Sequence, residues 1–193
     1  MHTEYEATFF PIEKDVIREK FRAAGASLIR EEYLQKRVNF HLPKESPHFS
    51  TGWMRVRDEG GATTMSIKAV ENNDVMEGQK EICLAVEDFE KARGFALALG
   101  VKEKAYQESK RELWQLDGVE ICIDEWPWLE PFVEIEGRGE SQVRGIADRL
   151  GFSWEDAYFG AVDGLYERRY GVSKYTINNE TPRFVFSEPC PFE

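Results

Sequence analysis

Hydrophobic and polar residues alternate with a period of two in several short segments of this chain. Such alternation predicts β-strands whose two faces meet different surroundings. The clearest segments are 4–9, 52–57, 64–68, 79–84, 119–124 and 132–136. Two further strands are predicted at 34–42 and 109–116, so the chain is expected to form about eight short strands.

Four other segments carry apolar residues at the spacing of a helix face. Their apolar positions lie within 12–21, 86–99, 143–150 and 158–166, and the fourth helix is expected to begin near Ser153. The last stretch, 174–193, holds three prolines and is expected to be extended, either laid on the surface or partly disordered. The predicted organisation is therefore one domain at 1–172 followed by an extended tail at 173–193.

The polar faces of the predicted strands repeat charges of one sign. Glu4 pairs with Glu6 on one face, and Arg55 pairs with Arg57 on another. The opposite faces are apolar and need to be covered, which the predicted helices can do from outside a closed sheet. The charged faces would then point into a lumen, and a barrel of about eight strands is just wide enough for side chains or one small ligand. The predicted fold is thus α+β, an eight-stranded antiparallel β-barrel with helices packed outside.

The side chains assigned to this lumen include both carboxylates and bases. The carboxylates are Glu4, Glu6, Glu81, Asp124, Glu134 and Glu136, and the bases are Arg55, Arg57, Lys68 and Arg111. Paired glutamates on neighbouring strands repel each other unless cations lie between them. Carboxylates bind divalent metal ions, and Arg and Lys bind phosphate oxygens. The pattern therefore predicts divalent metal together with a polyanion.

Composition bears on the domain size, the binding partners and the cellular location of the protein. The 193 residues suit one domain with a sizeable core, and a net charge of −11 disfavours nucleic acid and suits the gathering of divalent cations. The three cysteines lie far apart and match no zinc spacing, so a disulfide framework is not expected. Neither a secretory signal nor an apolar segment long enough for a membrane is evident. These features predict a cytoplasmic protein without membrane contact, and a homodimer stays open.

In these residues the chain resembles the CYTH family of triphosphate tunnel metalloenzymes, which joins class IV adenylyl cyclases and thiamine triphosphatases. The family's opening Glu-x-Glu-x-Lys corresponds to 4–8, its Arg-x-Arg strand to 55–57 and its closing Glu-x-Glu to 134–136. The resemblance runs from about Met1 to Tyr170. Its other matched positions are Lys68, Glu81, Arg111 and Asp124. It implies an antiparallel triphosphate tunnel in which Mg²⁺ or Mn²⁺ supports cleavage or cyclisation of a triphosphate.

The chain departs from the family pattern at three lining positions. Thr8 and Ser109 stand where the family has lysines, and Gln79 stands where an arginine is common. Fixed cations stabilise the charge that develops on a phosphoryl group. Losing them is expected to lower turnover or to shift the substrate towards a less charged compound.

Three functional readings follow. In the first, the protein is an enzyme that hydrolyses or cyclises a nucleoside triphosphate, thiamine triphosphate or inorganic triphosphate. The resemblance then implies that Glu4, Glu6, Asp124, Glu134 and Glu136 hold metal, and that Arg55, Arg57, Lys68 and Arg111 bind phosphate, with Glu4, Glu6 and these four bases as the catalytic set. The second is a non-catalytic module that binds a phosphorylated ligand or polyphosphate, as the loss of lysines at Thr8 and Ser109 suggests. The third is a structural domain whose lumen holds only salt bridges.

Overall fold

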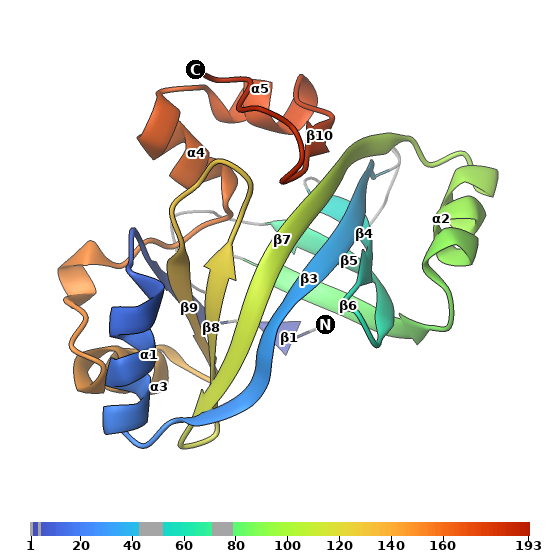
Figure 1. Cartoon of the computed structure of the whole chain (residues 1–193). Helices are drawn as coiled ribbons and strands as arrows, with labels where there is room; N and C mark the ends of the chain where they lie inside the picture. Colours follow the sequence, from blue (N-terminus) through green and yellow to red (C-terminus); the bar gives the residue numbers. More distant parts are fainter. Residues whose placement is uncertain (1, 4, 43–51, 71–78) are drawn as a thin grey trace.

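The structure is a computed structural model that describes residues 2–3, 5–42, 52–70 and 79–193. A single antiparallel sheet dominates it (Figure 1). The sheet strands are β1 (His2–Thr3), β2 (Tyr5–Phe9), β3 (Ser27–His41), β4 (Gly52–Asp58), β5 (Thr63–Val70), β6 (Gln79–Val86), β7 (Glu103–Leu116), β8 (Val119–Glu125) and β9 (Phe132–Gly137). β3 and β7 are longer than the strands predicted there, and their pairing includes register shifts.

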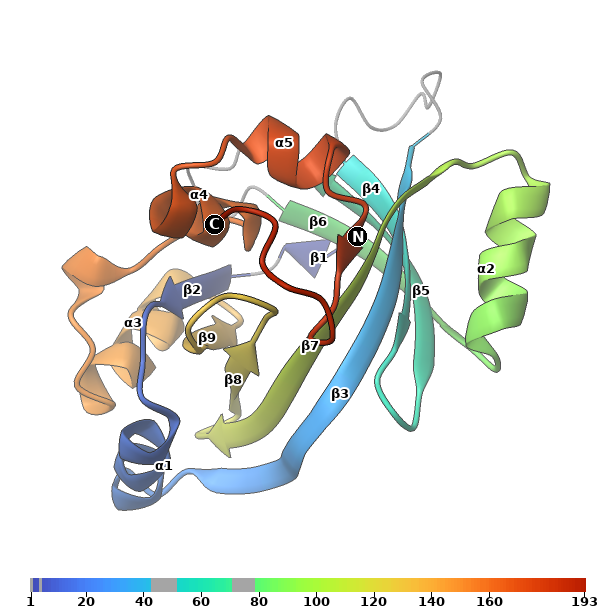
Figure 2. The same cartoon turned by 45° about the horizontal axis from the view of Figure 1, so that its top comes forward.

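The two edges of the sheet are formed by the same end of the chain. Its strand order is β1-β6-β5-β4-β3-β7-β8-β9-β2, so β1 and β2 stand at opposite ends although they are neighbours in sequence. β1 pairs with β6 and β2 pairs with β9, and the sheet between them is curled (Figure 2). The eight strands β2–β9 form an antiparallel half-barrel with helices outside, which confirms the predicted fold class.

Two helices cover the outer face of one half of the sheet. They are α1 (Lys14–Ala23) and α3 (Glu140–Arg149). Phe21 of α1 and Val143 of α3 are buried against the apolar face of β2, β8 and β9, which includes Ala7, Ile121 and Ile135. Burial of this apolar surface is the main force that holds the helices in place. The charged residues that alternate with these positions therefore face the concave side.

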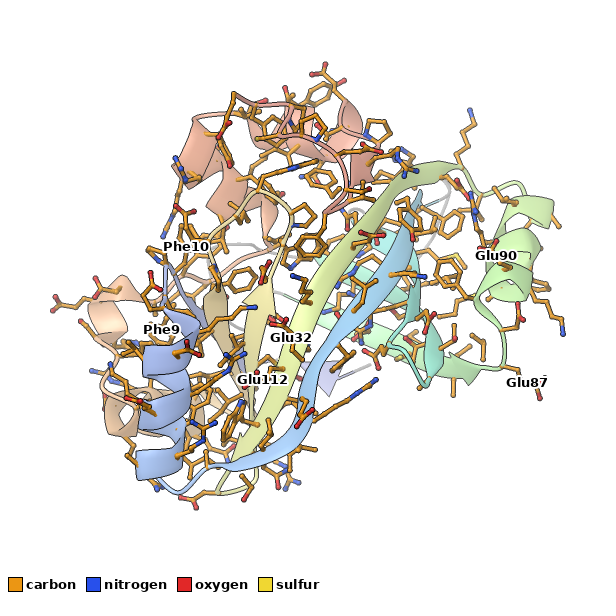
Figure 3. All side chains as sticks on the ribbon, in the orientation of Figure 1. Phe9, Phe10, Glu32, Glu87, Glu90 and Glu112 are labelled. Atoms are coloured by element: carbon orange, nitrogen blue, oxygen red, sulfur yellow. The ribbon has the colours of Figure 1, made fainter. Side chains whose placement is uncertain are left out.

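An acidic side chain is also buried on this outer face, away from the charged concave side. Glu112 on β7 is buried beside α1 (Figure 3). Arg18 donates to it through Nε and Nη2, at 3.0 and 2.7 Å from Oε2, and the Trp114 indole donates to Oε1 at 2.6 Å. Paired in this way, the carboxylate is tolerated inside the layer between helix and sheet.

The other half of the sheet is covered by α2 (Phe89–Ala98). The Asp88 side chain caps this helix by accepting from the Lys91 backbone N–H at 2.7 Å. Ala92 and Ala96 pack against the buried face of β3 and β4, where Val38 and Val56 are fully buried. Arg55 and Arg57 alternate with Val56 and so lie on the concave side.

The C-terminal region lies over one end of the curled sheet (Figure 2). It contains a short 3₁₀ turn (Trp154–Asp156), α4 (Asp163–Tyr170), α5 (Lys174–Asn179) and β10 (Arg183–Phe184), which pairs in parallel with β7. The fourth helix is thus interrupted, because the backbone of Tyr158 forms a bridge with Thr8 of β2. Within the stretch at 173–193, α5 is helical, and Phe184 is buried with Tyr166 and Trp126. In the described part of the chain, no helix is both long and apolar enough to cross a membrane.

Candidate functional site

The charged side chains predicted for the lumen lie together on the concave face of the sheet. The clearest sign is electrostatic contact between strands that are not neighbours. Lys68 on β5 counteracts the charge of Glu136 on β9, although several strands separate them in the sheet order. Glu6 of β2 acts on both Glu134 and Glu136. Glu4 lies outside the described residues.

Arg111 on β7 joins two of the carboxylates. Its Nε donates to Asp124 Oδ1 at 2.8 Å, and its Nη2 donates to Asp124 Oδ2 and to Glu134 Oε2. Burial acts to raise the pKa of Asp124, but the Arg111 guanidinium outweighs it and holds that pKa below its ordinary value. Both Asp124 oxygens therefore already bind a cation, and a metal-binding role for Asp124 stays a prediction.

The surroundings of Glu134 and Glu136 disfavour the ionised form of both carboxylates. Burial and the Glu6 and Asp124 carboxylates raise the pKa of Glu134 well above its ordinary value. Desolvation and the charges of Glu6 and Glu120 raise the pKa of Glu136. Oxygen donors of this kind suit Mg²⁺ or Mn²⁺, and a divalent cation would relieve their repulsion. Within the described ranges, no three His, Cys, Asp or Glu side chains already form a metal-binding group.

The bases of β4 and β5 lie on the same concave face. Arg55 Nη2 donates to Glu81 Oε1 at 3.1 Å, and Lys68 Nζ lies 4.0 Å from Glu81 Oε2. Arg57 Nη2 lies 2.7 Å from Glu59 Oε1. Its Nε is buried and has no hydrogen-bond partner among the described residues. This part of the site thus presents guanidinium and ammonium groups to the space that the carboxylates face.

The comparisons with known proteins identify the family. The model of the CYTH domain matches residues 13–154. The chain belongs to the CYTH family. A relative from Methanocaldococcus jannaschii named putative adenylate cyclase MJ0240 is 26% identical over 124 residues, which span 64% of this chain and 70% of that protein.

Solved structures share the CYTH fold of this chain. A putative adenylate cyclase from Vibrio parahaemolyticus superposes with a TM-score of 0.71 at 11% identity, over 86% of this chain and 98% of the other. The Hippeastrum protein HpAC1, described as a putative adenylyl cyclase with a dominant triphosphatase activity, gives a TM-score of 0.57 at 13% identity, over 90% of this chain and 97% of the other. At these identities the likeness concerns the fold alone.

The positions that depart from the CYTH lysine pattern are both buried in the concave face. Thr8 is 2% exposed and pairs in register with Glu134. Ser109 is 1% exposed and pairs with Gln35 of β3. Gln79 begins β6, opposite Val70, and its side chain lies outside what the structure describes. Neutral side chains, Thr8 and Ser109, therefore stand at these two positions of the charged lining.

Sequence reasoning missed one cation of this CYTH site, Arg37 on β3. Its side chain is buried and donates through Nη2 to Gln35 Oε1 at 2.7 Å and to Ser109 Oγ. The indole ring of Trp126 covers its guanidinium, with 4.5 Å between Cζ and the ring centroid. A partial signal was available, because Arg37 and Asn39 alternate with Val38 and Phe40 in the predicted strand at 34–42.

Proposed function

We propose that this CYTH protein is a metal-dependent enzyme that acts on a small-molecule triphosphate. The observation that carries the proposal is the opposition of two charge sets on one concave face. Glu134 and Glu136 are kept from ionising freely, and Arg55, Arg57 and Lys68 face the same space. A complex of divalent metal with a phosphate chain matches both sets at once, because the metal binds carboxylates and the phosphate binds guanidinium groups.

Each group then has a defined role. Glu6, Glu134 and Glu136, with Glu4 from outside the described residues, would hold Mg²⁺ or Mn²⁺, and Asp124 would contribute only by exchanging its bond to Arg111. Bound metal would neutralise charge on the phosphate oxygens. Arg55, Arg57, Lys68 and Arg111 would bind and orient the phosphate chain, and guanidinium forks favour bidentate contact with its oxygens.

Hydrolysis and adenylyl cyclisation remain two versions of this proposal. In hydrolysis, water attacks a phosphorus atom and the bond to the bridging oxygen breaks. In cyclisation, a ribose hydroxyl attacks the α-phosphorus and pyrophosphate leaves. The name of the Methanocaldococcus relative favours cyclisation, whereas the description of the Hippeastrum protein favours hydrolysis.

A second candidate function is a binding module without turnover. It is favoured by the neutral side chains at Thr8 and Ser109, which leave fewer fixed cations to stabilise a transferring phosphoryl group. A phosphorylated small molecule or polyphosphate would then bind to Arg55, Arg57 and Lys68 and leave unchanged. The cytoplasmic location expected from the sequence stays a prediction under either candidate.

A substrate panel separates these candidates. ATP, thiamine triphosphate and inorganic triphosphate are each incubated with the full chain and Mg²⁺ or Mn²⁺, and released phosphate, pyrophosphate and cyclic nucleotide are measured. We expect turnover of at least one compound, lost with EDTA and in Arg57→Ala. The control Arg93→Ala removes an arginine that pairs with Glu103 on the outer surface, so it should retain activity. Binding without turnover supports the module, and neither binding nor turnover rejects both candidates.

A further inference from the structure

Arg37 differs from the other cations of the concave face in having no acidic partner. Arg111 pairs with Asp124 and Glu134, Arg57 with Glu59, and Arg55 and Lys68 with Glu81. In the described part of the chain, no carboxylate oxygen lies within 4.0 Å of the Arg37 guanidinium. Its Nε is buried and has no hydrogen-bond partner there either. The lining therefore contains a buried guanidinium with an N–H group that has no acceptor within the described ranges.

The groups that hold Arg37 are all neutral. Gln35 Oε1 and Ser109 Oγ accept from its Nη2, and Ser109 Oγ in turn lies 3.2 Å from Gln35 Oε1. The Trp126 ring covers one face of the guanidinium. These contacts fix the position of the side chain without an ion pair to it. Burying a guanidinium without an ion pair is costly. The presence of Arg37 at this position therefore points to an anionic ligand that binds there.

The surroundings of Arg37 are positive on the side that faces the other bases. Arg37 is in register with Arg57 on β4. Burial and the charges of Arg55, Arg57 and Arg111 together lower the pKa of Arg37, and the Asp124 carboxylate opposes them only in part. Packing one guanidinium among three others is unfavourable in the absence of a shared counterion. A multiply charged anion placed among them would offset the repulsion that their own carboxylate partners leave.

We propose that Arg37 binds a phosphate oxygen of the ligand and supplies, from β3, the positive charge that Ser109 does not provide on β7. This inference rests on the proposed function and adds a ligand-binding residue to it. The Arg37 Nε–H and its remaining amino N–H groups are the donors for the phosphate. Ser109 and Gln35 act as positioning residues, because they hold the guanidinium in place from the opposite side.

The experiment is a calorimetric titration of the full chain with inorganic tripolyphosphate, with and without Mg²⁺. Arg37→Gln removes the charge and keeps a hydrogen-bonding side chain of similar length. We expect it to weaken binding about tenfold to a hundredfold, the loss typical of one charge-assisted hydrogen bond. Arg37→Lys, which keeps the charge, should lose less. The double variant Arg37→Gln/Ser109→Lys returns a cation to the same place and should recover most of the affinity.

Two controls make the outcomes distinct. Arg93→Gln removes a surface arginine and should bind as wild type does, and thermal melts verify that each variant is folded. If wild type binds no tripolyphosphate, the proposed function and this inference fail together. If wild type binds, Arg57→Ala weakens binding and Arg37→Gln does not, only this inference fails. Equal losses in Arg37→Gln, Arg37→Lys and the double variant would also overturn it, because shape and not charge would then be the cause.

Discussion

At the scale of single residues, the site combines two carboxylates and one guanidinium in unequal bonds. Arg111 donates twice to Asp124 and once to Glu134. The result is an ionised Asp124 with a lowered pKa beside a Glu134 whose pKa is raised. Two neighbouring acids whose surroundings push their pKa values apart typically share a proton between them. The negative charge of Glu134 is therefore disfavoured, because its one bond to Arg111 does not offset burial and the charges of Glu6 and Asp124.

This difference predicts how stability depends on pH in the absence of metal. Because the folded-state pKa of Glu134 lies above its unfolded value, the folded chain binds more protons than the unfolded chain between the two values. Stability should therefore fall as pH rises through that window, by about 1.4 kcal/mol for each pH unit that separates the two pKa values. In Glu134→Gln this loss should disappear. Urea unfolding in EDTA should give similar free energies for both proteins at low pH and a more stable variant at high pH.

The matched control for this prediction is Glu87→Gln, which removes the same charge from an exposed side chain beyond the end of β6 (Figure 3). Its free energy of unfolding should run parallel to that of wild type across the pH range. A Glu134→Gln variant that runs parallel to wild type as well would show that Glu134 ionises in the folded state without a penalty.

At the scale of elements, the strands were predictable and the C-terminal region was not. Alternation around Arg55–Arg57 and Glu134–Glu136 predicted both the strands and the face that each charge occupies, since side-chain direction in a strand has a strict period of two. Arg37 was missed because Lys36 beside it obscures the polar alternation, and its contacts come from Ser109 and Trp126, which are distant in sequence. The packing of 173–193 depends likewise on distant partners.

The C-terminal region should contribute directly to the stability of the sheet. Phe184 is 1% exposed and its ring makes an edge-to-face contact with Tyr166, with 5.2 Å between the ring centroids. Phe184→Ala should lower the free energy of unfolding by about 3–5 kcal/mol, because it leaves a cavity in the cluster around Trp126 and Phe132. Urea denaturation measures the change.

The control in the same region is Tyr175→Ala, since Tyr175 is exposed. It should change the free energy of unfolding by no more than about 0.5 kcal/mol. Equal transition midpoints for wild type and Phe184→Ala would mean that 173–193 is not packed on the sheet in solution.

At the scale of the whole molecule, the net charge conceals how the charges are distributed. The chain carries −11 overall, yet the concave face gathers Arg37, Arg55, Arg57, Lys68 and Arg111. These bases lie opposite the carboxylates of β2 and β9, and the helices cover the outer apolar faces. The sequence predicted this division between inside and outside. It could not predict which cations are paired, because pairing depends on strand order and register, which for example place Arg111 opposite Asp124.

The last prediction concerns divalent metal, and it follows from that division. A ligand that binds only the folded chain stabilises it by mass action, by about 2.7 kcal/mol at a hundred times its dissociation constant. Mn²⁺ should therefore raise the melting temperature over that in EDTA by about 5–10 °C. Screening of the overall negative charge also stabilises the protein, so both samples are brought to equal ionic strength with NaCl. Glu136→Gln should reduce the difference, because it removes one oxygen donor from the carboxylate group. Identical melting curves for wild type in Mn²⁺ and in EDTA would remove the metal from the proposed function and leave the phosphate-binding module as the better account of the concave face.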